Sequence, residues 1–152
     1  MFKSVIVGTD GSDTAREAVR RAADVARTHD ATLHLVHVRR AGPSASMLVG
    51  DGVMAGVVPV DRVELEEISQ KNAAEIVDAA AKEAAEAGVV VERHILTGDP
   101  ATVLLDLAAA VGADVIVVGS KGMTGAKRFL LGSVPNRIAH HATCDVLIVR
   151  TC

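Results

Sequence analysis

The sequence predicts an α/β protein, a single domain over residues 1–152 built on a doubly wound, five-stranded parallel sheet with helices on both faces. Short apolar runs alternate with longer segments in which apolar residues recur at helical spacing. The runs are apolar at successive positions, as expected of strands buried on both faces. With 152 residues, 49% of them hydrophobic, the chain is long enough for one ordinary core.

The order of the expected elements is strand, helix, strand, helix, and so on to a final strand. Each boundary rests on a change of apolar period or on a residue that favours a turn or a cap. The expected elements are a strand at 2–8, a helix at 13–28, a strand at 32–38, a loop at 39–58, a helix at 61–87, a strand at 89–96, a helix at 100–111, a strand at 114–118, a helix at 133–142 and a strand at 145–150.

In the first half, Ser12 is expected to cap the helix that follows the turn at 9–12, and Asp13 suits its positive first turn. The loop at 39–58 is rich in glycine, and long loops inside compact domains are often functional. We expect it to be flexible, either a lid over a ligand or a surface insert. The long helix after it ends at Gly88. Its expected apolar face is Val63, Ile68, Ala73, Ile76, Val77, Ala80 and Ala84.

In the second half, Asp99 is expected to cap a helix whose first residue is Pro100. Gly112 ends that helix, and the run at 114–118 follows as a buried strand. The apolar strand at 145–150 comes last, so we expect it at an edge of the sheet. An uncovered edge favours pairing with another chain.

A glycine pattern lies between the strand at 114–118 and the next helix. Gly119 and Gly122 are separated by two residues, and nine residues later come Gly132 and Ser133. Glycine lets a ligand approach the backbone closely, and the first N–H groups of a helix attract anions. Ser133 is expected to cap this helix. The pattern predicts a phosphate site that is not a Walker A loop, and the nominal dinucleotide fingerprint at 50–55 lacks a preceding strand.

These segments together resemble the ATP-binding branch of the universal stress protein family. The specific part of the resemblance is the set of three glycines with Ser133. Residues 5–12 resemble the family's opening strand and turn, 94–100 its middle turn, and 145–149 its last strand. The resemblance therefore extends over nearly the whole chain.

The resemblance implies the strand order 3-2-1-4-5 of an adenine nucleotide alpha hydrolase-like fold. The turn at Thr9-Asp10 and the loop at Gly119 then face each other where the winding reverses, which is where such folds bind ligands. It also implies that Asp10 binds ribose, that the backbone near Val38 binds adenine, and that Mg²⁺ or Mn²⁺ bridges the phosphates of ATP. The expected nucleotide-binding residues are Thr9, Asp10, Val38, Gly119, Ser120, Lys121, Gly122, Gly132, Ser133 and Val134.

Composition argues against several other functions. The net charge is −3 and only 1% of residues are aromatic, so neither a basic surface nor a stacking platform predicts nucleic-acid binding. No uncharged apolar run approaches the ~20 residues of a membrane span, and no signal peptide is recognised, so we expect a cytoplasmic protein. Cys144 and Cys152 match no metal or redox motif. The histidines form no catalytic or metal-ligating set by spacing, and no catalytic residue is expected.

The leading hypothesis is a nucleotide-dependent stress sensor or regulator that binds ATP. The resemblance also implies a homodimer, formed by antiparallel pairing of the edge strands at 145–150. One alternative is a cyclic AMP-binding protein, and another is a dimeric module without nucleotide. A weak ATP-hydrolysing or adenylating enzyme is a further alternative, but residues 8–13 do not match the Ser-Gly-Gly-x-Asp-Ser loop of adenylating enzymes.

Overall fold

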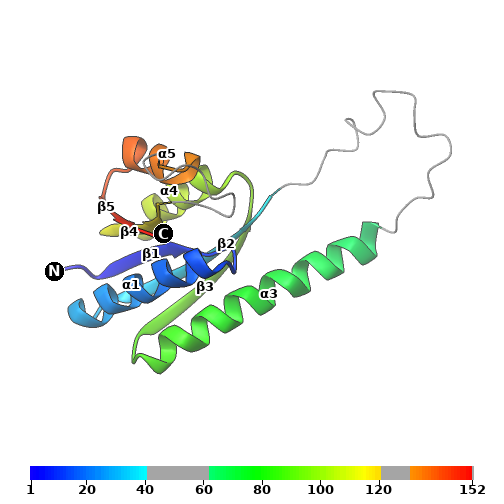
Figure 1. The fold of residues 1–152 in the computed structure, drawn as a ribbon, viewed down its shortest axis with the longest axis horizontal. Helices are drawn as coiled ribbons and strands as arrows, with labels where there is room; N and C mark the ends of the chain where they lie inside the picture. Colours follow the sequence, from blue (N-terminus) through cyan, green and yellow to red (C-terminus); the bar gives the residue numbers. More distant parts are fainter. Residues whose placement is uncertain (41–61, 121–130, 152) are drawn as a thin grey trace.

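The computed structural model describes residues 1–40, 62–120 and 131–151, and it confirms the predicted sheet (Figure 1). Five parallel strands lie in the order β3-β2-β1-β4-β5. The elements are β1 (Ser4–Gly8), α1 (Asp13–His29), β2 (Thr32–Arg39), α3 (Arg62–Glu86), β3 (Val90–Thr97), α4 (Pro100–Val111), β4 (Val115–Gly119), α5 (Ser133–His141) and β5 (Asp145–Val149). Arg39 belongs to β2, and residues 41–58 of the predicted loop lie outside the described residues.

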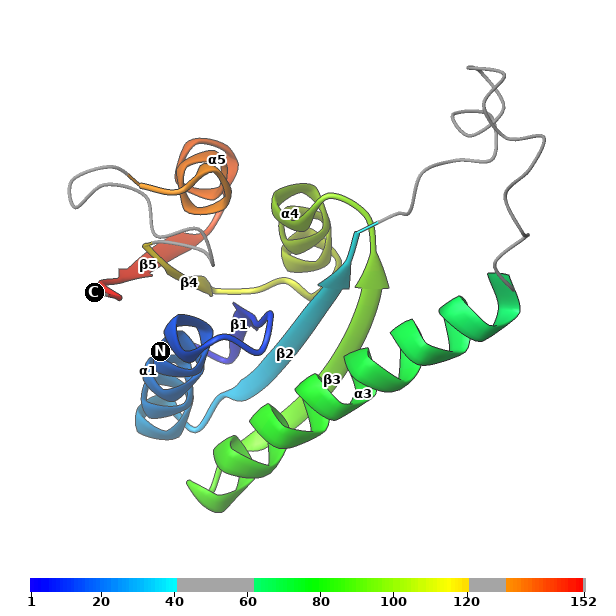
Figure 2. The ribbon, with the colours of Figure 1, turned by 45° about the vertical axis from the view of Figure 1, so that its right-hand side comes forward.

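Helices cover both faces of the sheet, with α1 and α3 on one side and α4 and α5 on the other (Figure 2). Successive side chains of β1 point to opposite faces of the sheet, so they belong to two different hydrophobic cores. Val5 and Val7 pack on the α1 and α3 side, whereas Ile6 packs with Leu104 and Ile138 on the α4 and α5 side. β1 is therefore completely enclosed, and its carboxyl end is fixed between β2 and β4.

Two of the three predicted helix caps are confirmed. The N–H of Ala15 donates to Ser12 Oγ over 3.2 Å, and that of Thr102 donates to Asp99 Oδ2 over 3.0 Å. The prediction for α5 is wrong, because its N-cap is Gly132 and Ser133 is already helical. The reason is that the Gly132 carbonyl accepts the first helical bond, from Asn136 N at 3.1 Å, so the helix begins one residue earlier.

The expectation that every strand is apolar and buried on both faces is wrong for the two edge strands. On β3, Val90 is 68% exposed and Ile95 is 42% exposed, and on β5 Leu147 is 39% exposed. An edge strand has a neighbour on one side only, and here the helices do not fully cover β3. The predicted edge position of the last strand is confirmed.

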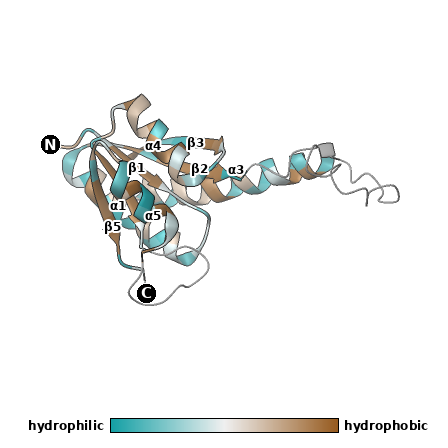
Figure 3. Ribbon diagram, turned by 90° about the horizontal axis from the view of Figure 1, so that it is seen from above, coloured by the Kyte–Doolittle hydropathy of each residue, from teal (hydrophilic) through white to brown (hydrophobic). Residues whose placement is uncertain are grey.

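Among the described side chains of α3, apolar residues are buried against the sheet only from Ala73 onward, whereas nearer its start Glu66 and Ser69 bond the side chain of Arg39 on β2. Ala73, Val77 and Ala84 are buried as predicted, but Ile68 is 59% exposed, so its assignment to the buried face is wrong. The amino-terminal part of the helix extends past the sheet, where no core is available to it (Figure 3). Despite its length, α3 carries too many polar residues to cross a membrane, and no other helix in the described ranges qualifies.

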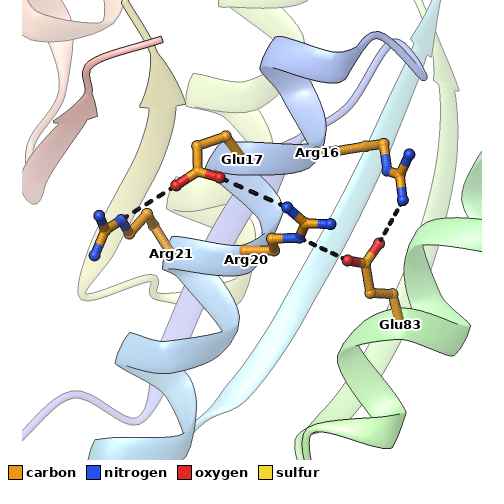
Figure 4. A network of polar contacts seen from close by, with 5 residues as sticks. All are labelled: Arg16, Glu17, Arg20, Arg21 and Glu83. Atoms are coloured by element: carbon orange, nitrogen blue, oxygen red, sulfur yellow. Dashed lines mark hydrogen bonds and ion pairs between the residues drawn. The ribbon is translucent and has the colours of Figure 1, made fainter.

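An ion-pair network joins α1 to α3 on the surface (Figure 4). Arg20 Nε donates to Glu83 Oε1 over 2.7 Å, and Arg16 reaches the other oxygen of Glu83 at 3.7 Å. Glu17 lies within 4 Å of Arg20 and Arg21 on α1 itself. The hydrogen bond to Glu83 raises the pKa of Arg20 above its ordinary value. Since these groups are solvated, they fix the approach of the helices more than they add stability.

Candidate functional site

A cavity of about 360 Å³ opens at the carboxyl ends of β1, β2 and β4 and at the first turn of α5. This is where ligands bind in sheets whose winding reverses between two neighbouring strands, here β1 and β4. The volume lies within the range of small-molecule pockets. The residues that line the cavity are Gly8, Thr9, Asp10, Ser12, Thr14, Ala15, Ala18, Val36, Val38, Arg40, Pro100, Leu104, Val118, Gly119, Gly132, Ser133, Val134 and Pro135.

The turn after β1 is held by its own backbone and by β2. The N–H of Thr9 donates to Val36 O over 2.8 Å, which continues the pairing of the two strands by one residue. On the other side, His37 Nδ1 donates to Thr9 O over 2.8 Å. The Gly11 N–H bonds Thr9 Oγ1, and the φ of +81° at Gly11 turns the chain toward α1. Thr9 is thus buried and fixed at the cavity wall.

Asp10 lies at the mouth of the cavity, and its side chain is exposed. Its Oδ1 accepts the N–H of Ser12 over 2.9 Å, which is the local bond expected of a turn aspartate. Within the described part of the chain, Oδ2 has no hydrogen-bond partner. A carboxylate has about four acceptor sites, so this contact leaves Asp10 able to accept bonds from hydroxyl groups of a ligand.

The far wall of the cavity is the end of β4 together with the start of α5. Gly119, Gly132, Ser133 and Val134 all line it. The N–H of Gly132 is already bonded to Ser120 O over 2.9 Å, whereas the N–H groups of Ser133 and Val134 precede the first helical bond. These two N–H groups carry the partial positive charge of a helix N-terminus, so this wall can bind an anion.

Ser120 does not line the cavity, although it was predicted with the site. Its N–H donates to Val149 O over 2.8 Å, and its Oγ accepts the N–H of Thr151 over 3.2 Å. These bonds join the residue after β4 to the last residue of β5 and to Thr151 beyond it. Lys121 and Gly122, also predicted, lie outside the described residues. Thr9, Asp10, Val38, Gly119, Gly132, Ser133 and Val134 are brought together around the one cavity.

The orientation of α5 is fixed by buried side chains that face the sheet and by hydrogen bonds to the start of α4. Pro135 and Ile138 are buried against the sheet. Arg137 Nη1 donates to Asp99 Oδ2 over 2.6 Å and Nη2 donates to Thr102 Oγ1 over 3.1 Å, which joins α5 to the start of α4. The bonds from Thr102, with Arg137 beside them, hold the pKa of Asp99 below its ordinary value.

Sequence reasoning missed several residues of the cavity. Arg40, the residue after β2, brings a positive charge to the rim. Leu104 and Pro100 come from α4 and add apolar surface beside Val36 and Val38. The signal for Arg40 was its place at the end of a central strand, but every strand end gives that signal. For the α4 residues, only the packing of that helix over β1 and β2 reveals them.

A second group of polar residues lies across β2 and β3. His34 Nδ1 is 3.1 Å from His94 Nε2 and 3.4 Å from Glu92 Oε2. His34 is 6% exposed, and burial lowers its pKa below the ordinary value, against the opposing effect of Glu92. No such set was expected from the sequence, because these residues meet only through the parallel register that puts His34 beside Glu92.

Comparison with known proteins identifies the family. The sequence pattern of the Universal stress protein family matches residues 1–150. Universal stress protein YxiE of Bacillus subtilis is 36% identical over 99% of this chain and 100% of its own length. A universal stress protein solved in complex with cAMP is 31% identical, with a TM-score of 0.70, over 99% of this chain and 98% of that one. The protein MJ0577 has a TM-score of 0.79 at 25% identity, over 100% of this chain and 98% of its own. This chain, with a parallel sheet whose winding reverses between β1 and β4 and a cavity at that point, belongs to the universal stress protein family.

Proposed function

We propose that this chain binds an adenine nucleotide in the cavity between β1 and α5, with ATP and Mg²⁺ or Mn²⁺ as the leading ligand. In this proposal the protein acts as a nucleotide-dependent regulator of a stress response. The observation that carries it is the convergence of seven of the ten predicted binding residues, far apart in the sequence, on one cavity of about 360 Å³. A cytoplasmic location stays a prediction from the sequence.

The phosphate end of the ligand would lie at the start of α5. The N–H groups of Ser133 and Val134 and the Ser133 hydroxyl are the donors of this wall. Arg40 at the rim supplies a full positive charge across the cavity. A divalent ion would be held mostly by phosphate oxygens and water, since Mg²⁺ keeps several waters when it binds nucleotides.

The nucleoside end would lie against β1 and β2. Val36, Val38 and Leu104 give an apolar wall on which a flat base can pack. Asp10 lies at the mouth with acceptor capacity left over, which suits the two hydroxyls of a ribose. The apolar wall, the carboxylate and the N–H donors thus suit the base, the sugar and the phosphate of a nucleotide.

Cyclic AMP is a second candidate ligand. It is supported by the 31% identical universal stress protein whose structure contains cAMP. A cyclic monophosphate uses the base and phosphate walls, but its 3′-oxygen is esterified and only the 2′-hydroxyl remains for Asp10. The two candidates therefore differ in how much they depend on Asp10 and on a divalent ion.

The test is a calorimetric titration of the purified, nucleotide-free protein with ATP and Mg²⁺, which measures the dissociation constant. Asp10→Asn should weaken ATP binding about tenfold or more, because a hydrogen bond to a charged group contributes about 1.5–3 kcal/mol. Asp13→Asn is the matched control, since Asp13 is an exposed aspartate three residues away that does not line the cavity. Absence of ATP binding, or equal loss in both variants, would overturn the proposal for ATP.

Competition separates the two ligands. If cAMP displaces ATP and binds more tightly in the absence of divalent ions, the second candidate replaces the first. Nucleotide released from freshly purified, denatured protein and identified by mass gives an independent answer. The chain has no Trp or Tyr, so adenine absorbance is easily seen in this protein.

We also propose that the chain forms a homodimer through β5. This strand lies at the edge of the sheet, and Leu147 on it is 39% exposed. An antiparallel partner strand would satisfy the open edge. Sedimentation at micromolar concentration should give twice the chain mass of 15.7 kDa, and Leu147→Glu should shift the protein to monomer. A wild-type protein that sediments as a monomer contradicts the proposal.

A further inference from the structure

Three potential metal ligands converge on the sheet outside the nucleotide cavity. Side chains of His34, Glu92 and His94 place one ligand atom each within 4.8 Å of the others. They come from two neighbouring strands, β2 and β3, whose parallel register pairs His34 with Glu92 and Val36 with His94. None of the three lines the cavity described above.

All three side chains lie on the face of the sheet that carries α4 and α5. Val36, two residues after His34, packs in the core under these helices, and alternation puts His34 on the same face. Val90, which shares this face with Glu92 and His94, is 68% exposed. The cluster therefore has one buried ligand, His34, and an opening to solvent beside Glu92 through which an ion can enter.

The distances match the coordination sphere of a small tetrahedral ion. With metal–nitrogen bonds of about 2.0–2.1 Å, two ligand atoms on one tetrahedral ion lie roughly 3.3 Å apart. His34 Nδ1 is 3.1 Å from His94 Nε2 and 3.4 Å from Glu92 Oε2. Both distances are within about 0.2 Å of that spacing. The third pair, His94 and Glu92, has its ligand atoms within 4.8 Å, and the exposed Glu92 side chain can move to complete the site.

A single hydrogen bond joins only two of the three groups, His34 and His94. His34 Nδ1 has a single proton or a single lone pair, yet two groups approach it, an imidazole nitrogen and a carboxylate oxygen. One N–H cannot serve both acceptors fully. A cation at the centre interacts favourably with all three groups at once.

We propose that His34, Glu92 and His94 bind one divalent transition-metal ion, with Zn²⁺ as the leading candidate. Two imidazoles and one carboxylate are ligands typical of zinc, whereas Mg²⁺ and Ca²⁺ prefer oxygen alone. Water completes the coordination on the open side. The site is independent of nucleotide binding.

The experiment uses the full chain without a histidine tag, reduced and stripped of metal by a chelator. Zn²⁺ is titrated in competition with a chromophoric chelator, and Co²⁺ is added separately to record its electronic spectrum. We expect one ion per chain and a four-coordinate Co²⁺ spectrum without a thiolate charge-transfer band. The missing band distinguishes this site from binding by the cysteines.

The variants are chosen at positions that tolerate change. Glu92 is exposed and His94 is half-buried, so Glu92→Gln and His94→Asn should fold, which circular dichroism checks. Each should weaken Zn²⁺ binding by about tenfold or more. His141→Asn is the matched control, an exposed histidine on α5, and should bind as wild type. Failure to bind Zn²⁺ at micromolar concentration, or unchanged affinity in both ligand variants, would overturn the proposal and leave a hydrogen-bonded histidine pair.

Discussion

Ile138 is one of the side chains that hold α5 in place, and replacing it tests how much apolar packing supports the anion-binding wall of the cavity. Ile138 is completely buried and packs with Ile6 and Leu104 under α5. Ile138→Ala removes three carbon atoms from a packed core that cannot fully close around the gap. Substitutions of this kind cost about 2–5 kcal/mol in the free energy of unfolding. We expect a loss of about 3 kcal/mol.

A loss of that size corresponds to a fall in Tm of about 6–12 °C, since a domain of this length shifts by about 2–4 °C per kcal/mol. The control is the same substitution at Ile68, which is 59% exposed on α3. Both residues are helical, so the gain in helix propensity from isoleucine to alanine is similar and cancels in the comparison. Ile68→Ala should change stability by less than about 0.5 kcal/mol.

Stability is measured by urea denaturation followed by far-ultraviolet circular dichroism, because the chain has no Trp or Tyr for fluorescence. Two results would refute the reasoning. If Ile138→Ala costs less than about 0.5 kcal/mol, the packing under α5 does not hold the helix. If Ile68→Ala costs as much as Ile138→Ala, the exposed part of α3 is packed in solution.

Three further predictions concern a glycine, a carboxylate and a thiol. Gly98 has a φ of +147°, and a Cβ added there would lie 2.9 Å from Val103 Cγ2, whereas a Cβ added at Gly88 meets nothing within 4 Å. Gly98→Ala should therefore lower the midpoint of urea denaturation more than Gly88→Ala does. Equal midpoints for the two variants would contradict this prediction. The N–H groups of residues 3 and 4 hold the pKa of Asp114 below its ordinary value of 3.8, so its stabilisation is present above pH 3.8 and is lost as the pH falls through the lower, folded pKa. Asp114→Asn should therefore be less stable than wild type at pH 7, and this difference in stability should become smaller below pH 3.8. A difference that stays constant as the pH falls would contradict the prediction. Burial raises the pKa of Cys144, so with the terminal cysteine replaced by serine the thiol should react with iodoacetamide at pH 8 more slowly than free cysteine.

The fold was largely predictable because its signals are local. The N-caps Ser12 and Asp99, and the glycines Gly88 and Gly112 after α3 and α4, predict helix boundaries that agree with the structure to within one or two residues. The exposure of Ile68 was not predictable, because its spacing matches the apolar face of the helix. Only the length of the sheet shows that the helix passes beyond its core.

The site was predictable where it follows strand ends and glycine spacing, as at Asp10, Gly119 and Gly132. Arg40 and Leu104 were missed because they belong to the cavity only through packing. The contact between His34 and His94 was missed for a related reason, since it joins residues 60 positions apart through strand register. Parallel strands are joined by long crossover connections, so no tight turn in the sequence indicates which residues of the two strands lie side by side.

The central position of β1 has a consequence for how the protein is made. This strand is synthesised before the other four strands of the sheet, yet one of its two neighbours is β4, with Val5 beside Val115. At about 5–20 residues per second, the ribosome needs roughly 6–22 s to deliver that partner. During this interval one edge of the apolar strand β1 is open, and the cavity has only the wall formed by β1 and β2. Nascent chains stopped before residue 115 should therefore be sensitive to protease and prone to aggregate, whereas release of the complete chain closes the sheet and assembles the ligand site in the same step.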